Sequence, residues 1–351
     1  MIRVPVRVRS LVRIVAMCSA ASVALASCAT TNVTTTTHVT GLPAISISVP
    51  LSVVACTTNN SCVAVGTSNL DVSPTSVGEY RSANGHWTAL AVPSADTSTY
   101  VQSSSCWNDG CLFVGSQSSA DLVWRYDARS HAITVATAPT GASGISAISC
   151  YASMTCAILD STKSGPRFLT TDDGGATWTP PTTITVPSHD AVTSLSCVSS
   201  NECMTVFQNS SNGVAIYVTD DAGASWTQRT GSSTITWSVL TSLNCSGQKC
   251  VGLAKLFTGW RVVRTKNFAV TWTKVSSLRG AISALACMTL ERCVVGGMTN
   301  FQSSVPLLAT VTSGVVHVAK LKYVPSPISD VACGSNVCAA IGVTTVLTLR
   351  P

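Results

Sequence analysis

Charged side chains are scarce in this sequence. They make up 10% of its 351 residues, and aromatic residues add only 6%. After the first 27 residues there is no run of about 18 apolar residues, so we expect no transmembrane helix there. Helical periodicity is absent, and so is any basic run interleaved with aromatic residues. We therefore expect a fold built from strands and no nucleic-acid partner.

Signatures of catalysis are also missing. The chain has three glutamates, and no sequence feature pairs any of them with a second carboxyl group. It contains no Gly-x-Ser-x-Gly elbow, no His-Glu-x-x-His helix and no Gly-rich phosphate loop. The histidines show no ligand spacing; they are His38, His86, His131, His189 and His317. We expect neither a cofactor nor a metal, and enzymatic activity is the weaker hypothesis.

The first 27 residues have the pattern of an export signal. Four arginines precede residues 14–27, an apolar run too short to span a bilayer. The run ends in Leu25-Ala26-Ser27-Cys28, which resembles the lipobox of bacterial lipoproteins, where cleavage leaves a lipid-carrying cysteine. An ordinary secretory signal is the alternative. We expect an exported chain that is either anchored to the outer face of the cell membrane through lipid on Cys28 or freely secreted.

Removal of the signal changes the charge balance. Residues 1–27 hold four of the 21 basic residues and none of the 15 acidic ones, so the remainder carries 17 against 15, a net charge of +2. Residues 28–41 are rich in threonine and have almost nothing to bury, which is typical of a flexible tether. The folded domain is then expected to span residues 42–351.

Cysteines recur at regular intervals. Cys18 belongs to the signal and Cys28 is the lipidation candidate. The other fourteen form pairs separated by four or five residues, and the first cysteines of successive pairs lie 42 to 50 residues apart. The pairs are Cys56/Cys62, Cys106/Cys111, Cys150/Cys156, Cys197/Cys203, Cys245/Cys250, Cys287/Cys293 and Cys333/Cys338. In an exported chain this predicts disulfides, because a zinc site needs four ligands and usually a tighter spacing.

A self-similar period of this length indicates a solenoid, a propeller or an array. In the fourth repeat, four short strands are predicted, at residues 192–197, 203–207, 214–219 and 225–229. Four antiparallel strands in each of seven repeats predict an all-β, seven-bladed propeller. The seventh repeat ends after its third strand. We therefore expect the alternating segment 44–49 to pair with residues 344–350 and complete the last blade.

A second motif, Thr-x-Asp-x-Gly-x-[Ser/Thr]-Trp, recurs in phase with the cysteine pairs. Its two full copies consist of Thr171, Asp173, Gly175 and Trp178, and of Thr219, Asp221, Gly223 and Trp226. A degenerate copy ends in Trp272 and a shortened one in Trp87. The motif resembles the Asp-box (BNR) repeat of sialidase-like propellers. We expect a structural role, because the carboxylate can accept hydrogen bonds from its own turn, glycine permits the turn and tryptophan is buried beneath it.

The resemblance leaves several functions open, because a fold does not determine a function. A sialidase would imply a tyrosine nucleophile with a partner glutamate, an aspartate acid/base, three arginines and an Arg-Ile-Pro element, and no Arg-Ile-Pro occurs here. Our leading hypothesis is a monomeric, non-catalytic scaffold that binds a protein or a glycan at the cell envelope. A divergent glycoside hydrolase and an assembly factor for a membrane protein complex are the alternatives.

Propeller topology predicts which loops share a face. The cysteine loops and the Asp-boxes would lie on one face, and the more variable loops on the other. Variable loops on a rigid scaffold commonly carry recognition. We therefore predict a partner-binding face that contains Tyr100, His189, Asp190, Trp237, Phe257, Trp260, Arg279 and Phe301.

Overall fold

The chain divides into Met1–Thr34 and Thr35–Pro351, and all of the residues described below belong to the second unit. The computed structural model describes residues 44–46, 51–68, 75–81, 85–93, 99–117, 120–141, 144–162, 165–186, 191–208, 213–229, 237–269, 271–299, 305–319, 321, 324, 326–343 and 345–350. The predicted signal (1–27) and tether (28–41) lie outside them. Within this part of the chain, no helix has the length and apolarity needed to cross a bilayer.

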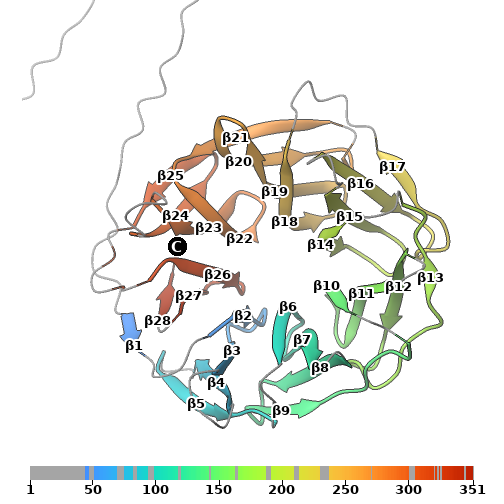
Figure 1. The fold of residues 1–351 in the computed structure, drawn as a ribbon. Coiled ribbons are helices and arrows are strands. Elements are labelled where there is room, and N and C mark those ends of the chain that lie inside the picture. The colour runs from blue at the N-terminus through green and yellow to red at the C-terminus, as the bar shows by residue number, and fades with distance from the viewer. Residues whose placement is uncertain are drawn as a thin grey trace, which may run out of the picture. The chain divides into compact units, whose positions relative to one another are not determined.

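Seven four-stranded antiparallel sheets form the blades of a propeller around a central opening (Figure 1). The innermost strands, in blade order, are β2 (Val53–Cys56), β6 (Tyr100–Cys106), β10 (Ile145–Ala152), β14 (Ala191–Cys197), β18 (Val239–Ser246), β22 (Ala281–Thr289) and β26 (Ile328–Cys333). The second strands are β3 (Cys62–Ser68), β7 (Gly110–Gln117), β11 (Thr155–Thr162), β15 (Cys203–Gln208), β19 (Lys249–Leu256), β23 (Arg292–Met298) and β27 (Cys338–Gly342). The third strands are β4 (Thr75–Arg81), β8 (Ala120–Asp127), β12 (Gly165–Thr171), β16 (Val214–Thr219), β20 (Gly259–Thr265), β24 (Pro306–Thr312) and β28 (Thr345–Leu349). The outermost strands are β5 (Trp87–Ala91), β9 (Ala132–Val135), β13 (Thr182–Thr183), β17 (Thr227–Arg229), β21 (Trp272–Leu278), β25 (Val315–Val318) and β1 (Ala44–Ser46).

The first and last strands of the chain close the ring. β1 pairs antiparallel with β28, with Ala44 opposite Leu347 and Ser46 opposite Thr345. Three strands from the C-terminal end and one from the N-terminal end therefore share the seventh sheet. This confirms the prediction from the missing fourth strand, although residues 47–49 of the predicted segment lie outside the described residues.

The hydrophobic core is divided among the contacts between blades. Seven clusters of buried side chains occur, and each joins two adjacent blades. Between blades four and five, for example, Met204 and Val218 pack with Trp237 and Trp272. Burial of apolar surface stabilises the fold by about 25 cal/mol per Å². Because that surface lies between sheets, one blade cannot keep its hydrophobic faces from water without its neighbours.

Seven disulfides join the innermost strand of each blade to the second strand, at the predicted pairs. Each joins cysteines only five or six positions apart in the sequence. The chain-entropy model gives about 2 kcal/mol for a loop of this size. Disulfides in this number indicate an oxidising environment outside the cytosol.

The second cysteine of each pair is also a core residue, in addition to its predicted place in a disulfide. Each of these cysteines is at most 3% exposed and belongs to a different one of the seven clusters between blades. They are Cys62, Cys111, Cys156, Cys203, Cys250, Cys293 and Cys338. The reason is their place in the second strand, where both faces of the sheet are covered by neighbouring blades. The sulfur of each therefore adds apolar packing as well as a covalent link.

A β-bulge bends most of the innermost strands. In β6, β10, β14, β22 and β26 the register shifts between the residues five and three positions before the first cysteine. A bulge inserts an extra residue, bends the strand and redirects a side chain. The residues that directly follow it are Ser103, Ala147, Ser194, Ala284 and Asp330. The sequence does not predict this bulge. The bulge determines how the innermost strands bend at the centre of the ring.

Two glycines of the repeat are explained by a close backbone approach. Gly115 and Gly297 both lie four residues after the second cysteine of their blade. A Cβ atom at Gly115 would overlap the carbonyl oxygen of Tyr100, and one at Gly297 would overlap that of Ala281. Both obstructing oxygens belong to the innermost strand of the same blade. At these two positions the first strand approaches the second so closely that only a residue without a side chain fits.

Candidate functional site

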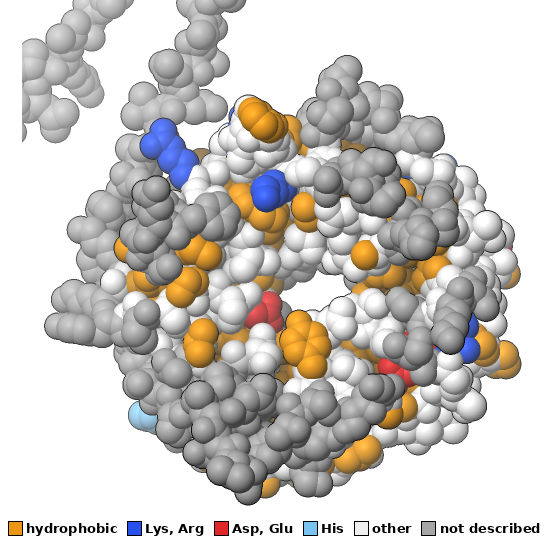
Figure 2. Space-filling view, in the orientation of Figure 1, with side chains coloured by type: hydrophobic (Ala, Val, Ile, Leu, Met, Phe, Trp, Pro, Cys, Tyr) orange, Lys and Arg blue, Asp and Glu red, His pale blue; other side chains and the backbone are white. Residues whose placement is uncertain are grey.

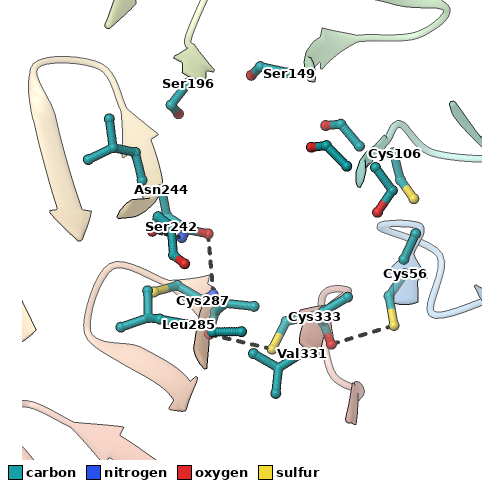
Figure 3. A pocket seen from close by; sticks show the side chains of 18 of the residues that line it. Cys56, Cys106, Ser149, Ser196, Ser242, Asn244, Leu285, Cys287, Val331 and Cys333 are labelled. Carbon is teal, nitrogen blue, oxygen red and sulfur yellow. Dashed lines mark hydrogen bonds between the residues drawn. The ribbon is translucent and has the colours of Figure 1, made fainter. Parts of the chain in front are cut away.

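A polar channel occupies the centre of the ring, between the innermost strands (Figure 2). Its volume is about 780 Å³. The lining consists mostly of serine, alanine and the first cysteine of each disulfide, and several of these side chains point into the opening in Figure 3. In the part of the chain that the structure describes, Asp330 is the one charged residue that lines the channel. A ligand there would therefore meet hydroxyl and backbone groups more than charges.

A ladder of hydrogen bonds connects adjacent blades around this channel. In four successive seams, the backbone N–H of a first cysteine donates to the side chain that precedes the first cysteine of the previous blade. The pairs are Cys150 to Ser105 (2.8 Å), Cys197 to Ser149 (2.9 Å), Cys245 to Ser196 (3.2 Å) and Cys287 to Asn244 (3.3 Å). The serines along the channel are thus partly committed to holding the blades together.

The ladder ends where alanine takes the acceptor position, at Ala286, Ala332 and Ala55. Two of these three seams bring a cysteine sulfur close to a backbone oxygen, as does the seam of Cys150 and Ser105, where the ladder bond is also present. Cys333 Sγ lies 3.7 Å from Ala286 O, and Cys56 Sγ lies 3.6 Å from Ala332 O (Figure 3). Both sulfurs belong to disulfides and carry no hydrogen, so we read these as van der Waals contacts.

Asp330 lies at the seam between the last and the first blade. Its Oδ2 accepts a hydrogen bond from the backbone N–H of Val54 at 2.9 Å, and its Oδ1 accepts one from Val331 N–H at 2.9 Å. Burial raises the pKa of this carboxyl group to about 6, and these two bonds only partly oppose that effect. Asp330 is therefore a group whose charge changes in the mildly acidic range.

The lining of the channel does not match that of a glycoside hydrolase. Hydrolysis by the usual mechanism needs two carboxyl groups flanking the scissile bond. Among the described residues, those that line the channel provide Asp330 alone and include no tyrosine, arginine or histidine. Among the described residues there is also no group of three or more histidine, cysteine, aspartate or glutamate side chains arranged to hold a metal ion. The channel is thus equipped for hydrogen bonding to a ligand.

The two full Asp-boxes form similar turns. In blade three, Asp173 Oδ1 accepts hydrogen bonds from Thr171 Oγ1 (2.8 Å) and from the backbone N–H groups of Ala176 and Thr177 (2.9 Å each). Asp221 makes the corresponding bonds to Thr219 Oγ1 (2.7 Å) and Ser225 N–H (2.9 Å). The hydroxyl groups of Thr177 and Ser225 donate to the Oδ2 atoms of Asp173 and Asp221, at 2.6 and 2.5 Å. These two bonds, together with those to Oδ1, lower the pKa of both aspartates to about 2.

The degenerate copy keeps this geometry without a charge. Asn267 Oδ1 accepts from Thr265 Oγ1 and from Thr271 N–H, at 2.9 Å each. Its Nδ2 donates to Thr271 Oγ1, also at 2.9 Å. A neutral amide therefore builds the same turn as the carboxylate. The position acts as a hydrogen-bonding centre of the turn.

Each of these turns is joined to the cysteine loop of its own blade. Gly174 N–H donates to Met154 O (2.8 Å), and Ala222 N–H donates to Asn201 O (3.2 Å). The acceptor is always two residues before the second cysteine, and blades two, five and six repeat the pattern with the carbonyls of Asp109, Gln248 and Glu291. The Asp-boxes and cysteine loops thus share one face, which we name the cysteine face. The loops between second and third strands and between blades make the opposite loop face.

The tryptophans of the motif fill the gaps between blades. Trp178 packs in the cluster between blades two and three, and its Nε1 donates to Thr137 O at 2.8 Å. Trp226 meets Phe168 edge to face, with 5.3 Å between ring centroids. Trp272 meets Trp237 in the same way at 5.4 Å. In each case the motif's ring seals a contact with the preceding blade.

The predicted partner-binding face is only partly assembled. Phe257 and Tyr100 are exposed, with relative accessibilities of 106% and 58%, but they belong to blades five and two. The prediction that Trp237 belongs to the partner-binding face is wrong. Trp237 is 8% exposed and packs against Trp272, so it belongs to the core. His189, Asp190 and Phe301 lie outside the described residues.

The structure does bring Phe257, Trp260 and Arg279 together at one end of blade five. Phe257 lies in the turn between β19 and β20, and Trp260 pairs with Leu278, the residue before Arg279. Sequence reasoning missed two basic residues at the same place, Lys255 and Arg261. They are separated along the chain by uncharged residues, so no basic run marks them.

Comparisons with known proteins support the fold. No family's sequence model matches the chain, and no curated protein matches it. Among solved structures, YCF48 bound to D1 peptide has a TM-score of 0.62 at 13% identity, over 89% of this chain and 97% of that one. A GH74 xyloglucanase from Xanthomonas campestris has a TM-score of 0.61 at 13% identity, over 88% of this chain and 54% of the other. A virginiamycin B lyase from Staphylococcus aureus has a TM-score of 0.59 at 11% identity, over 89% and 99%.

This chain is a seven-bladed β-propeller. The similar structures include a peptide-bound protein, a hydrolase and a lyase, so the likeness establishes the architecture and leaves the activity open.

Proposed function

We propose that this protein is an exported lipoprotein whose propeller binds an extended polypeptide segment of an envelope protein in its central channel, without catalysis. The observation that carries the proposal is the lining of the channel. Hydroxyl and backbone groups dominate it, and Asp330 supplies the one charge. Serine hydroxyls both donate and accept hydrogen bonds, which suits the alternating C=O and N–H groups of an extended chain.

Two further observations support this reading. The volume of about 780 Å³ lies in the range of known ligand pockets. A propeller of similar architecture, YCF48, has a structure with a bound peptide. A glycan also presents many hydroxyl groups and is the competing ligand. If the bound segment belongs to a membrane protein complex, the protein would act as an assembly factor.

The lipid anchor is tested separately from the ligand. Mass spectrometry of the N-terminal peptide should show a diacylglycerol-modified Cys28 as the first residue of the mature chain. Replacement of Cys28 by alanine should release the protein from the membrane fraction or leave the signal uncleaved. An unmodified N-terminus at another residue, with the wild-type protein in the medium, would favour the freely secreted alternative.

The ligand is tested by photo-crosslinking on intact cells. Gln102 lines the channel and is exposed, so a photoreactive residue there samples the opening. Val135 on the outermost strand of the same blade, 66% exposed, is the matched control. We expect one recurrent protein captured at position 102 and absent at position 135. Equal capture at both positions, or capture of glycan alone, would contradict polypeptide binding in the channel.

A further inference from the structure

Charge is distributed very unevenly around the ring. Residues 222–329, which include blades five and six, contain eleven basic residues and one acidic residue. The rest of residues 28–351 contains six basic and fourteen acidic residues. The net charges are therefore +10 and −8, although the sum is only +2. An asymmetry of this size creates a field that attracts an anionic partner to one side of the molecule.

The single acid of the basic segment lies on the cysteine face. Glu291 belongs to the cysteine loop of blade six and pairs with Arg264, at 2.7 Å between Oε1 and Nη1. The loop face lies at the other end of the strands. There, blade five presents Lys255, Arg261 and Arg279 from a segment, residues 222–290, that has no acidic residue at all.

An exposed aromatic ring projects from this basic site. Phe257 occupies the two-residue turn between β19 and β20, where Leu256 faces Gly259, and its side chain is fully exposed. Exposure of this ring to water is unfavourable, because its large apolar surface contacts no other part of the protein. Contact with a partner would remove that surface from water.

The surrounding side chains are held in place. Lys255 Nζ lies 5.8 Å from the ring centroid of Trp260, which is a cation–π distance. Arg261 donates from Nη1 to Trp260 O at 2.8 Å and from Nη2 to Thr258 Oγ1 at 3.2 Å. These contacts leave the positive charges beside the exposed ring, and Figure 2 shows blue and orange side chains close together over the sector of β19 and β20. We name Lys255, Phe257, Trp260, Arg261 and Arg279 the blade-five tip.

We propose that the blade-five tip docks onto an anionic phospholipid membrane, with Phe257 inserted at the level of the headgroups and the basic side chains against the phosphates. A single protruding ring flanked by cations, beside a partly buried tryptophan, has the composition of an interfacial membrane contact. The inference rests on the proposed lipid anchor for its setting: about 16 residues connect Cys28 to β1 and can span at most about 55 Å, so the propeller stays near the bilayer.

The tip lies two blades from β1, the strand that follows the proposed tether and belongs to blade seven. β1 begins opposite Leu347 and ends opposite Thr345, so the chain enters it at the cysteine-face end of the sheet, and a tether that can span about 55 Å still allows the loop face to meet the bilayer. Docking at blade five would hold the propeller by two points, the lipid and the tip. A lipid chain alone gives weak, reversible attachment, and a second, electrostatic contact is the usual means of making it stable.

The test uses the mature chain, residues 28–351 produced without the signal and with Cys28→Ser, so that neither the lipid nor the apolar signal can contribute to binding. Co-flotation with vesicles of phosphatidylcholine alone is compared with vesicles that also contain phosphatidylglycerol. We expect binding only to the anionic vesicles, and its loss at high ionic strength. Lys255→Gln with Arg279→Gln should weaken the binding roughly 10–30-fold, and Phe257→Ser roughly tenfold or more.

Tyr100→Ser is the matched control, because it removes an exposed aromatic residue from blade two, away from the basic segment. It should change vesicle binding less than about twofold. Unchanged thermal unfolding of all variants shows that the fold is intact. Equal binding to neutral vesicles, or an equal effect of Tyr100→Ser, would overturn the proposal. Neither result depends on the Cys28 mass measurement or on crosslinking at position 102, so failure here and failure of the proposed function are separately visible.

Discussion

The carboxylate of Asp330 on β26 accepts a hydrogen bond from the backbone N–H of Val54 on β2, across the seam where the last blade meets the first. Ser194 on β14 makes the same bond to the N–H of Leu243 on β18, at 3.0 Å. In both pairs the acceptor residue lies three positions before the first cysteine of its own blade. The donor residue lies two positions before the first cysteine of the next blade. Asp330 is thus the charged version of a contact that elsewhere uses a hydroxyl group.

The stability of the ring should depend on pH through Asp330. Its folded-state pKa of about 6 lies above the ordinary value of 3.8, so protonation favours the folded state. This contribution is fully present below about pH 3.8 and is lost as the pH rises through about 6. Its size is roughly 2–3 kcal/mol. Denaturant titrations at about pH 4 to 7 would show it as a decline in unfolding free energy.

Asp330→Ser isolates that titration, because it copies the Ser194 contact without an ionisable group. We expect a flatter pH profile and a stability at neutral pH no lower than that of the wild type. Asp330→Ala removes the acceptor as well as the ionisable group, and should cost about 1–3 kcal/mol at about pH 4 and less than that at neutral pH. A serine variant with an unchanged pH profile would contradict the assignment of the titration to Asp330.

The Asp-boxes should act at a lower pH. The pKa values of Asp173 and Asp221 are about 2, below the ordinary value, so the stability they contribute is present above about pH 4 and is lost as the pH falls through 2. Asp173→Asn with Asp221→Asn should fold, since Asn267 builds the same turn. Acid unfolding of this double variant, followed by circular dichroism, should be less steep between about pH 4 and pH 2. Asp220→Asn controls for loss of one negative charge in the same turn.

Gly223 should tolerate no side chain. Its φ is +83°, and an added Cβ would overlap the ring of Phe168 on the preceding blade. Gly247 also has positive φ, +53°, but a Cβ there meets no atom within 4 Å. We expect Gly247→Ala to cost about 1 kcal/mol and Gly223→Ala about 2 kcal/mol more. Equal losses in thermal unfolding would show that backbone conformation alone matters at Gly223.

The ladder of hydrogen bonds between adjacent blades can be reduced or extended by one bond through a single substitution. Ser196→Ala removes the acceptor of Cys245 N–H and should cost about 1 kcal/mol. Ala286→Ser places a hydroxyl at the corresponding position of blade six, where it can accept from Cys333 N–H, and should stabilise by about 0.5–1 kcal/mol. Chemical denaturation of both variants measures the pair of effects. Destabilisation by Ala286→Ser would mean that the seam between blades six and seven has no space for the bond.

Much of the architecture could be read from residues such as Cys197 and Cys203. Their spacing recurs in every repeat, and it predicted the hairpins, the number of blades and the disulfides. The missing last strand of the seventh repeat predicted the pairing of β1 with β28. These features follow from local sequence patterns and from the number of repeats, so they can be predicted without knowledge of the packing.

The contacts around the channel could not be read in the same way. Asp330 looks like an ordinary polar residue of an alternating strand, and only the bulge between Ile328 and Asp330 turns it towards the next blade. Trp237 was assigned to a variable loop face because it lies between repeats, yet Trp272 buries it. A side chain's burial depends on what neighbouring blades place opposite it, and the local sequence does not contain that information.

The sequence by itself determined the seven-fold repeat, the disulfide pairs, the Asp-box turns and the closing strand, because each follows from short-range spacing along one chain. Only the tertiary structure decided which of these features act together. Ring closure places Asp330 against Val54, 276 residues away, and it collects Lys255, Phe257 and Arg279 at the end of one blade. The physical reason is that electrostatics and burial act through distances in space, and a ring brings distant segments side by side while its periodic sequence makes every blade look alike.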